Sequence, residues 1–342
     1  MKNKKVSIIM PAYNCENTIR VAIESVINQS YDNIELIIVN DGSSDNTEKE
    51  IKSIKSEKIK YYSIKNQGVS YARNYGVKHA LGEYLMFIDA DDEYTPHFIR
   101  KMFEEIEKSE ADQVCASYYT VDNNNKIIGK ISYKYYTFFS PCECIIQLQK
   151  NNLFNQVWNK IYKTKIIKEN KIYFDEKISI AEDEKFNLEY LNYCNKIRII
   201  DEPLYKYKIT LNGLGFSFNL KSNEIKLQII NQIEKIFEKQ KYDKSYIFES
   251  YIIQYFSLVS NIVDKRNKKT TKEKLMQISK DIICNKKCQN IMKISKKELR
   301  KKYKILAIII LTKNRYIIYV FGKIARYYDK HYKKKFGGEI KC

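Results

Sequence analysis

The sequence lacks long apolar runs, has few histidines and has no regular spacing of cysteines. Its longest apolar run, Ile305 to Leu311, has seven residues, whereas a helix needs about 20 to span a bilayer, so no membrane-crossing helix is expected. Only three histidines are present, and the eight cysteines follow no repeated spacing. We therefore predict neither a zinc site nor a disulfide framework, and favour reduced thiols in the cytoplasm. The first apolar run stops at Pro11, too early for a signal sequence, and is interpreted as a first strand.

Most of the chain carries no excess of positive charge. Residues 1–220 contain 30 Lys and Arg against 30 Asp and Glu, whereas residues 221–342 contain 31 against 11, so the whole net charge of +20 lies in the last third. Segments 227–240 and 251–263 in that third have the pattern of amphipathic helices. The length of 342 residues allows one large domain and a smaller region. We predict a main domain, 1–220, and a basic, mostly helical region, 221–342.

The main domain alternates short apolar runs with helical patterns. The runs are rich in branched residues, and the first helical pattern, near residues 19–27, places its apolar side chains on one face. Strands that are buried on both faces and separated by helices indicate βαβ units in a Rossmann-like, mainly parallel sheet. The fold class is therefore α/β, with expected strands at 6–10, 34–39, 84–88 and 114–117.

Three of the expected strands end in polar loops, where such sheets bind ligands. These loops are residues 11–14, 40–47 and 89–92. At a strand end, residues i and i+2 point the same way, so Asp89 and Asp91 can converge on Mg(II) or Mn(II). An alternative is that these acidic residues open a helix that begins at Pro96, which explains Asp92 and Glu93 better than Asp89. Similarly, the loop after Asn40 is also typical of a capped turn into a helix.

Two long segments carry a family resemblance. "VSIIMPAYNCENTIRVAIESVINQSYDNIELIIVNDGSSDNT" and "NQGVSYARNYGVKHALGEYLMFIDADD" resemble, in order, the nucleotide-sugar-binding half of glycosyltransferase family 2. The similarity covers about the first 120 residues, and continues more loosely through "VWNKIYK" and "AEDEKF". The resemblance implies an A-type glycosyltransferase fold, with a nucleotide-sugar half at 1–120 and an acceptor half at 121–220. It also implies an inverting transferase that uses a nucleotide-diphosphate sugar, most often UDP-linked.

The resemblance also implies roles for individual residues. Asp41 would meet the uracil, Asp89 the ribose and the metal, and Asp91 the metal. Asp183 falls at the position of the catalytic base, and Glu182 beside it belongs to the acceptor side. The remaining donor-binding positions are Pro11, Tyr13, Asn14, Asn66, Gly68, Arg73 and Ala90, and the remaining acceptor-side positions are Trp158, Asn159 and Lys160.

Some features of the family pattern are missing. Relatives often have a third metal ligand, commonly histidine, in the region that the loop Leu211 to Asn219 occupies here. Processive members have a Q-x-x-R-W motif and several membrane spans, whereas this chain has one tryptophan, in "VWNK". A single-addition enzyme is therefore favoured, with Mn(II) or Mg(II) as its cofactor.

Two classes of function follow from these observations. The first is a transferase that passes sugar from a UDP-sugar to a glycan or a lipid-linked acceptor. The second is a nucleotide-sensing protein whose basic tail binds nucleic acid. Because the expected metal and base carboxylates are all present, we favour the enzyme and expect no nucleic-acid partner. The basic tail is then expected to dock on the anionic cytoplasmic face of the membrane, helped by apolar segments 305–311 and 316–328; in the second, Lys323 and Arg326 alternate with aromatic residues. The alternative is that the apolar faces of the tail pack on the catalytic domain while its lysines keep the protein soluble.

Overall fold

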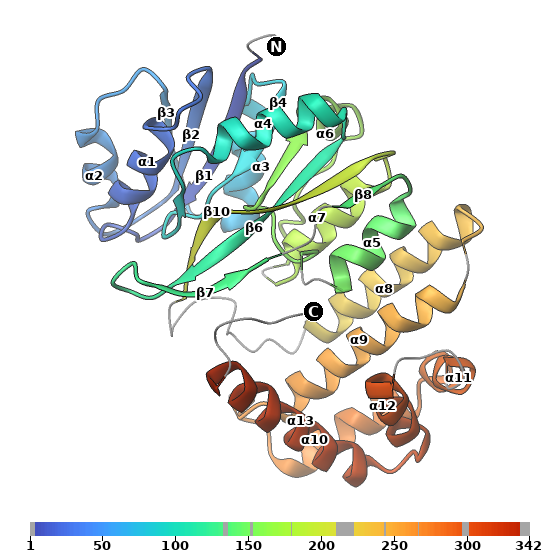
Figure 1. The fold of residues 1–342 in the computed structure, drawn as a ribbon. Helices are drawn as coiled ribbons and strands as arrows, with labels where there is room; N and C mark the ends of the chain where they lie inside the picture. The colour runs from blue at the N-terminus through green and yellow to red at the C-terminus, as the bar shows by residue number, and fades with distance from the viewer. Residues whose placement is uncertain are drawn as a thin grey trace. The chain divides into compact units, whose positions relative to one another are not determined.

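The computed structural model describes residues 4–132, 136–150, 153–178, 180–209, 222–242, 244–265, 267–295 and 301–335 (Figure 1). The chain divides into two compact units, one comprising the described residues up to Ile209 and the other those from Ser222 to Lys335. The expected domain boundary at Leu220 and the loop Leu211 to Asn219 lie outside the described residues.

A sheet forms the centre of the first unit. Its first part is entirely parallel, in the order β3 (Ile59–Ile64), β2 (Ile34–Asp41), β1 (Val6–Ala12) and β4 (Tyr84–Phe87). Every residue of β1, β2 and β4 is buried, because branched and aromatic side chains cover both faces of these strands. The predicted strands in this part are confirmed.

The sheet becomes mixed beyond β4. The short strand β9 (Lys160–Lys163) lies antiparallel between β4 and β6 (Gln113–Val121), and β10 (Ile197–Lys208) then runs parallel to β6. Three more strands add antiparallel pairings, namely β5 (Glu93–Tyr94), β7 (Ile127–Ile131) and β8 (Tyr136–Phe138). The α/β class is confirmed, and the antiparallel strands were not expected because they are short and carry no long apolar run.

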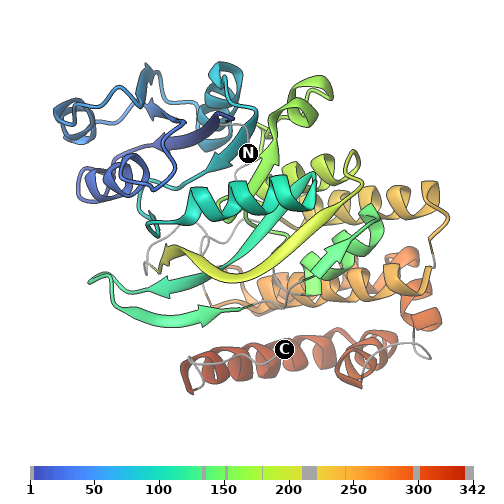
Figure 2. The ribbon, with the colours of Figure 1, turned by 45° about the horizontal axis from the view of Figure 1, so that its top comes forward.

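Helices cover the sheet. Helix α1 (Ile19–Ile27) buries Ile19, Ala22, Ile23 and Val26, as its spacing predicts. Helix α3 (Val69–His79) approaches β1 closely, since a Cβ at Gly76 would lie 2.5 Å from the side chain of Ile9. Helix α4 (Phe98–Ser109) lies across β6 and β10 (Figure 2). The other helices of this unit are α2 (Thr47–Ser53), α5 (Pro141–Lys150), α6 (Thr164–Glu169) and α7 (Glu182–Leu191).

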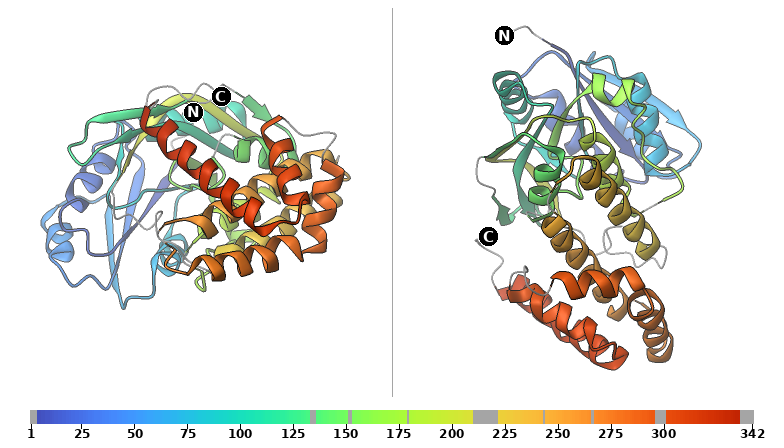
Figure 3. Two further views of the ribbon diagram at one scale, coloured as in Figure 1. Left: turned by 90° about the horizontal axis from the view of Figure 1, so that it is seen from below. Right: turned by 90° about the vertical axis from the view of Figure 1, so that its right-hand side faces the viewer.

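The second unit is helical, as expected. Helix α9 (Lys244–Val263) contacts most of the others, and Figure 3 shows them packed side by side. Among the described residues, none of the helices has the length and apolar content that a membrane span requires. The remaining elements are α8 (Ser222–Lys239), α10 (Thr271–Ile278), the π-helix η2 (Ser279–Ile283), α11 (Lys286–Ser295), α12 (Lys301–Leu311) and α13 (Arg315–Lys335).

Candidate active site

Three aspartates follow β4 within four positions, and they lie in different environments. The Asp92 N–H donates to the Asp89 carbonyl at 3.1 Å, which closes a tight turn after the strand. Within this turn Ala90 is buried, the Asp89 side chain is about one third exposed and Asp91 is exposed. Protein atoms packed around its carboxyl, together with the charge of Asp89, raise the pKa of Asp91 to about 6 even though the residue reaches solvent. The turn therefore offers two carboxylates to a ligand.

Asp92 does not open a helix, contrary to the alternative interpretation of this segment. Its side chain is buried, and it accepts hydrogen bonds from the Tyr205 hydroxyl and the Lys208 N–H, each at 2.7 Å. Burial, followed by the charges of Asp91 and Asp89, raises its pKa well above the ordinary value. The helix itself starts at Phe98, two residues after Pro96. Asp92 therefore anchors the turn to β10, an interaction with residues more than 100 positions away that no local pattern reveals.

Arg73 of α3 is the centre of the site. Its buried guanidinium places Nη1 2.7 Å from Asp183 Oδ1 and Nη2 2.9 Å from Asp89 Oδ1. Nη1 also lies 3.6 Å from Glu182 Oε1. Burial disfavours the charged guanidinium, but these three carboxylates outweigh it and raise the pKa of Arg73 above its ordinary value. One buried cation thus links the predicted donor carboxylate with the predicted base.

An aromatic pair supports Arg73 from its other side. The guanidinium carbon lies 5.2 Å from the centroid of the Phe174 ring, and Phe174 stacks on Phe186 with centroids 4.2 Å apart. A cation over an aromatic face is attracted by the ring quadrupole, so Phe174 favours this position of the guanidinium. Phe174 was missed in the sequence because it lies in an irregular segment with no recognisable motif.

Asp183 lies in the first turn of α7. Ala181, at the N-cap position of this helix, has a positive φ of 63°. Alanine rarely adopts this conformation, which often marks a functional site. Burial raises the pKa of Asp183 to about 7; Arg73 opposes this, while Glu182 and Asp89 add to it. A single guanidinium cannot neutralise three carboxylates, so repulsion among them remains. A carboxyl that titrates near neutrality is suited to general-base chemistry.

The loops after β1 and β2 are tied to each other. Pro11 is buried at the end of β1, Tyr13 is exposed, and Asn14 has a positive φ of 46°. The Asn14 side-chain oxygen accepts from the Ser44 N–H at 2.9 Å, while the Asn14 N–H donates to Ser43 Oγ at 3.0 Å. The predicted donor residues of β1 are therefore held rigidly beside the loop that follows β2.

Asp41 holds the loop in front of α3. Its buried carboxylate accepts from the N–H groups of Gln67 at 2.8 Å and Gly68 at 2.7 Å. Gly68 has a φ of 93°, and a Cβ at Gly42 would lie 2.8 Å from the Asn66 nitrogen. The predicted donor residues Asn66 and Gly68 are thus brought to the end of β2. The loop that follows β2 leads into helix α2, and the residue before that helix is Asn46; Asp41 does not cap it.

Three of the four predicted acceptor-side residues, Trp158, Asn159 and Lys160, are buried in a packed layer, whereas Glu182 lies beside Arg73. Trp158 stacks on Tyr205 and Tyr207 with centroids 4.3 Å and 5.3 Å away. Asn159 donates through Nδ2 to the Ala116 carbonyl at 2.8 Å. Because Tyr205 also holds Asp92, this layer is connected to the turn after β4.

Lys160 is the third member of this set and is fully buried. Its ammonium donates to the Leu153 carbonyl at 2.7 Å, to Asn159 Oδ1 at 3.0 Å and to the Gln156 carbonyl. Burial lowers its pKa to about 8. These bonds give Lys160 a role in holding the segment before β9, and contact with an acceptor stays a prediction.

The residues after β4 fit a divalent cation by their chemistry. The negative charges of Asp89 and Asp91 repel each other, so a cation between them would be stabilising. Arg73 contacts only the Oδ1 oxygen of Asp89. Oxygen donors from carboxylates and a diphosphate are the ligands that Mg(II) and Mn(II) prefer. In the described part of the chain, no group of three or more His, Cys, Asp or Glu side chains is arranged as a metal site. Two protein ligands therefore fit only together with oxygens from a bound diphosphate.

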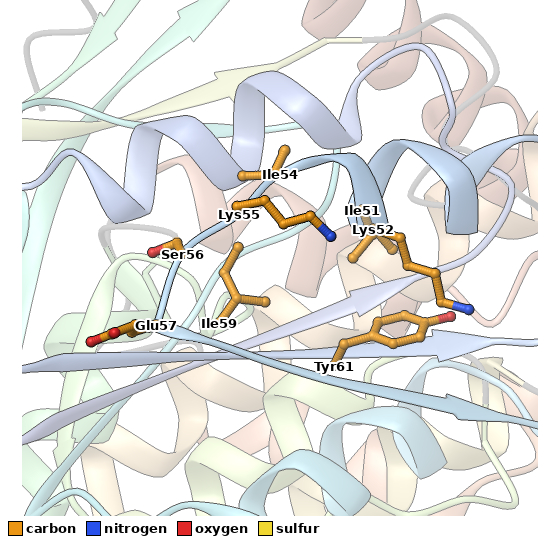
Figure 4. Close-up of a pocket in the computed structure, with 8 residues that line it drawn as sticks. All are labelled: Ile51, Lys52, Ile54, Lys55, Ser56, Glu57, Ile59 and Tyr61. Atoms are coloured by element: carbon orange, nitrogen blue, oxygen red, sulfur yellow. The ribbon is translucent and has the colours of Figure 1, made fainter.

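A separate hollow lies between α2 and β3 (Figure 4). It has a volume of about 570 Å³ and none of the predicted site residues lines it. Its lining consists of Ile51, Lys52, Ile54, Lys55, Ser56, Glu57, Ile59 and Tyr61. The carboxylate cluster around Arg73, and not this hollow, has the chemistry of an active site.

Comparisons with known proteins agree with the fold. The structure is similar to that of S. aureus TarS residues 1–349 in complex with UDP-GlcNAc, with a TM-score of 0.72 at 20% identity, covering 94% of this chain and 92% of that one. At this identity the likeness shows the fold, which is the predicted A-type glycosyltransferase fold.

Sequence relatives give the family. The uncharacterized glycosyltransferase EpsJ of Bacillus subtilis is 31% identical over 214 residues, 61% of this chain and 62% of EpsJ, so the chain aligns with less than two thirds of that relative. An uncharacterized glycosyltransferase of Haemophilus influenzae is 31% identical over 233 residues, 64% of this chain and 70% of that protein. The family model described as "Glycosyl transferase family 2" matches residues 7–170. Together these matches show that the chain belongs to glycosyltransferase family 2.

Proposed function

We propose that this protein transfers a single sugar from a UDP-sugar to a hydroxyl group, with inversion at the anomeric carbon. The observation that carries the proposal is the contact of one buried arginine with both Asp89 and Asp183. Through Arg73, the carboxylate of Asp89, which is suited to bind the donor, lies close to that of Asp183, which is suited to deprotonate an acceptor. The similarity to TarS, which has been crystallised with UDP-GlcNAc, supports a UDP-linked donor.

In this proposal the loops at the carboxyl ends of β1, β2 and β4 bind the nucleotide. Both Asp41 oxygens accept backbone N–H bonds, so its first task is to hold the Asn66–Gly68 segment, and its remaining lone pairs would meet the uracil. Tyr13, which is exposed, is free to cover the base. The other members of the donor set are Pro11, Asn14, Arg73, Asp89, Ala90 and Asp91.

Asp89 and Asp91 would hold a Mn(II) or Mg(II) ion together with the diphosphate. A divalent cation there supplies charge neutralisation for the departing UDP. The protein's own contribution would be to hold the turn that carries the two carboxylates, through the bonds of Asp92 to Tyr205 and Lys208. Arg73 contacts one Asp89 oxygen, and the other would be the one to bind the metal.

Asp183 would act as the base. It takes the proton of the acceptor hydroxyl as that oxygen forms its bond to the anomeric carbon and the bond to the UDP oxygen breaks. One base is sufficient for a single displacement, which inverts the anomeric centre. Arg73 holds the Asp183 carboxylate through Oδ1, so the second oxygen, Oδ2, is the one available to the hydroxyl. Trp158, Asn159, Lys160 and Glu182 would shape the acceptor side.

The acceptor is proposed to be a surface glycan or a lipid-linked precursor. A lipid-carried acceptor would place the protein on the cytoplasmic face of the membrane, where its basic region, 221–342, faces anionic lipid. The alternative of a nucleotide sensor with a nucleic-acid-binding tail finds no support in the family to which the chain belongs.

A panel of nucleotide sugars tests the proposal. The full chain is incubated with each donor, with Mn(II), with Mg(II) and with a chelator, and released UDP or other nucleotide is measured. Release from one UDP-sugar with metal is expected. Tight UDP binding without release from any donor, with or without acceptor extracts, would contradict the transferase and favour the sensor.

A further inference from the structure

Helix α13 packs on its unit through one narrow face. Ile318 is fully buried, and a Cβ at Gly322 would lie 2.7 Å from Val259 of α9. Farther along, the guanidinium of Arg326 donates to Ser260 Oγ at 3.0 Å and is paired with Asp264. These contacts fix which side of α13 faces its neighbours.

The opposite face of α13 is also apolar and is exposed. Five of its side chains have between 45% and 60% of their surface accessible: Tyr316, Ile317, Val320, Ile324 and Tyr327. Their spacing places all five within one side of the helix, turned away from Ile318 and Gly322. In the preceding helix, α12, Ile305 and Ile308 are exposed to a similar extent. Scattered exposed apolar residues are common, but a continuous stripe of this kind marks an interaction surface.

The stretch of sequence that carries this stripe is basic. Residues 299–328 contain eight Lys and Arg and no Asp or Glu. Lys313, Arg315 and Lys323 are exposed, with Lys323 Nζ 4.7 Å from the ring centroid of Tyr319. Arg326, which the sequence pattern grouped with Lys323 as a cation of the membrane-docking segment, instead faces inward to Asp264. The cations available to a partner are therefore those at the start of α13 and along its edge.

We propose that this stripe is a docking surface for an anionic lipid leaflet, with α13 lying in the plane of the interface. An apolar face bordered only by cations is what such a helix requires, because the side chains enter the acyl boundary while Lys and Arg remain among the headgroups. A second copy of the chain would bring the same cations to the same stripe, and like charges would oppose that contact. The inference rests on the proposed function only in so far as a lipid-carried acceptor gives the docking a purpose.

Flotation with vesicles tests the surface. The full chain is mixed with vesicles of phosphatidylcholine alone or of phosphatidylcholine with phosphatidylglycerol. We expect the chain to float with the anionic vesicles only, and to be released at high salt. The double variant V320E/I324E should bind the anionic vesicles at least about tenfold more weakly than the unchanged chain, because two inserted apolar side chains are replaced by anions. Both positions are exposed, so the fold should be retained.

A matched control is Met276→Glu in α10, which changes an equally exposed apolar residue of the same unit. It should float like the unchanged chain. Equal flotation of V320E/I324E and the unchanged chain would overturn the proposal. So would a change of sedimentation mass in V320E/I324E without loss of flotation, which would identify a second copy as the occupant.

UDP binding in solution separates this inference from the proposed function. Calorimetry with UDP should give the same affinity for the unchanged chain, V320E/I324E and Met276→Glu. If no chain binds UDP, the proposed function fails while the flotation result still decides the docking surface. If all bind UDP and none floats with anionic vesicles, only the docking surface is contradicted.

Discussion

Arg73 Nη1 lies 2.7 Å from Asp183 Oδ1, across 110 positions of the sequence. The same guanidinium reaches Asp89 through its other terminal nitrogen, at 2.9 Å. Two carboxylates with different predicted tasks, donor binding and proton removal, therefore share one cation. A change at Arg73 is expected to disturb both tasks, whereas a change at either carboxylate should disturb mainly one.

The first prediction concerns the shape of the arginine. Arg73→Lys keeps the positive charge but loses the planar fork that contacts Asp89 and Asp183 together. We expect weaker UDP binding and transfer reduced by roughly 100-fold, since the base and the donor are no longer aligned. Calorimetry and initial rates measure the two effects. Arg198→Lys, at a partly buried pair with Glu105, is the control, and equal losses in both variants would remove the special role of Arg73.

The second prediction separates binding from chemistry. Asp183→Asn keeps the size of the side chain but cannot accept a proton as a carboxylate does. Donor affinity should survive, and transfer should fall by roughly 100-fold or more, the usual range for loss of a general base. Glu182→Gln is the comparison at the neighbouring carboxylate and should lose less transfer than Asp183→Asn, because Glu182 is not the predicted base. The assignment is off by one residue if Glu182→Gln abolishes transfer and Asp183→Asn does not.

The third prediction is the pH profile of transfer. The pKa of Asp183 is raised to about 7, first by burial, and the base is active only when deprotonated. Log kcat/KM should therefore rise with pH below about 7 and level off above it. Initial rates between acidic and mildly alkaline pH give the profile. A rise that persists unchanged in the residual activity of Asp183→Asn would assign the titration to another group.

The fourth prediction concerns the cation. If Asp91 helps to hold a metal beneath the diphosphate, Asp91→Asn should weaken UDP binding strongly with Mn(II) or Mg(II) present and little when the metal is chelated. Calorimetry with UDP under both conditions measures the difference. Asp32→Asn, at a side chain that is 91% exposed, serves as the control. The same weakening of Asp91→Asn with and without metal would argue against the metal role.

Local patterns in the sequence determined the framework of the site. Apolar runs buried on both sides predicted β1, β2 and β4, because each residue of such a strand meets other side chains on one face or the other. The spacing of Ile19, Ala22, Ile23 and Val26 predicted α1. Since parallel strands end at one edge, the same patterns also predicted that the loops bearing Asp41 and Asp89 lie together.

Only the tertiary structure decided which charged side chains meet. Asp92 has the local pattern of a residue that opens a helix, yet Tyr205 and Lys208 of β10 bury it. In the sequence, Arg326 alternates with aromatic residues in the same way as Lys323, yet Asp264 holds it inside the helical unit. The local sequence around Arg73 gives no sign of its pairing with Asp183, which arises because α7 packs near α3. Helical and strand periodicity follows from interactions between near neighbours, whereas these pairings depend on the packing of segments that lie 62 to 116 residues apart in the sequence.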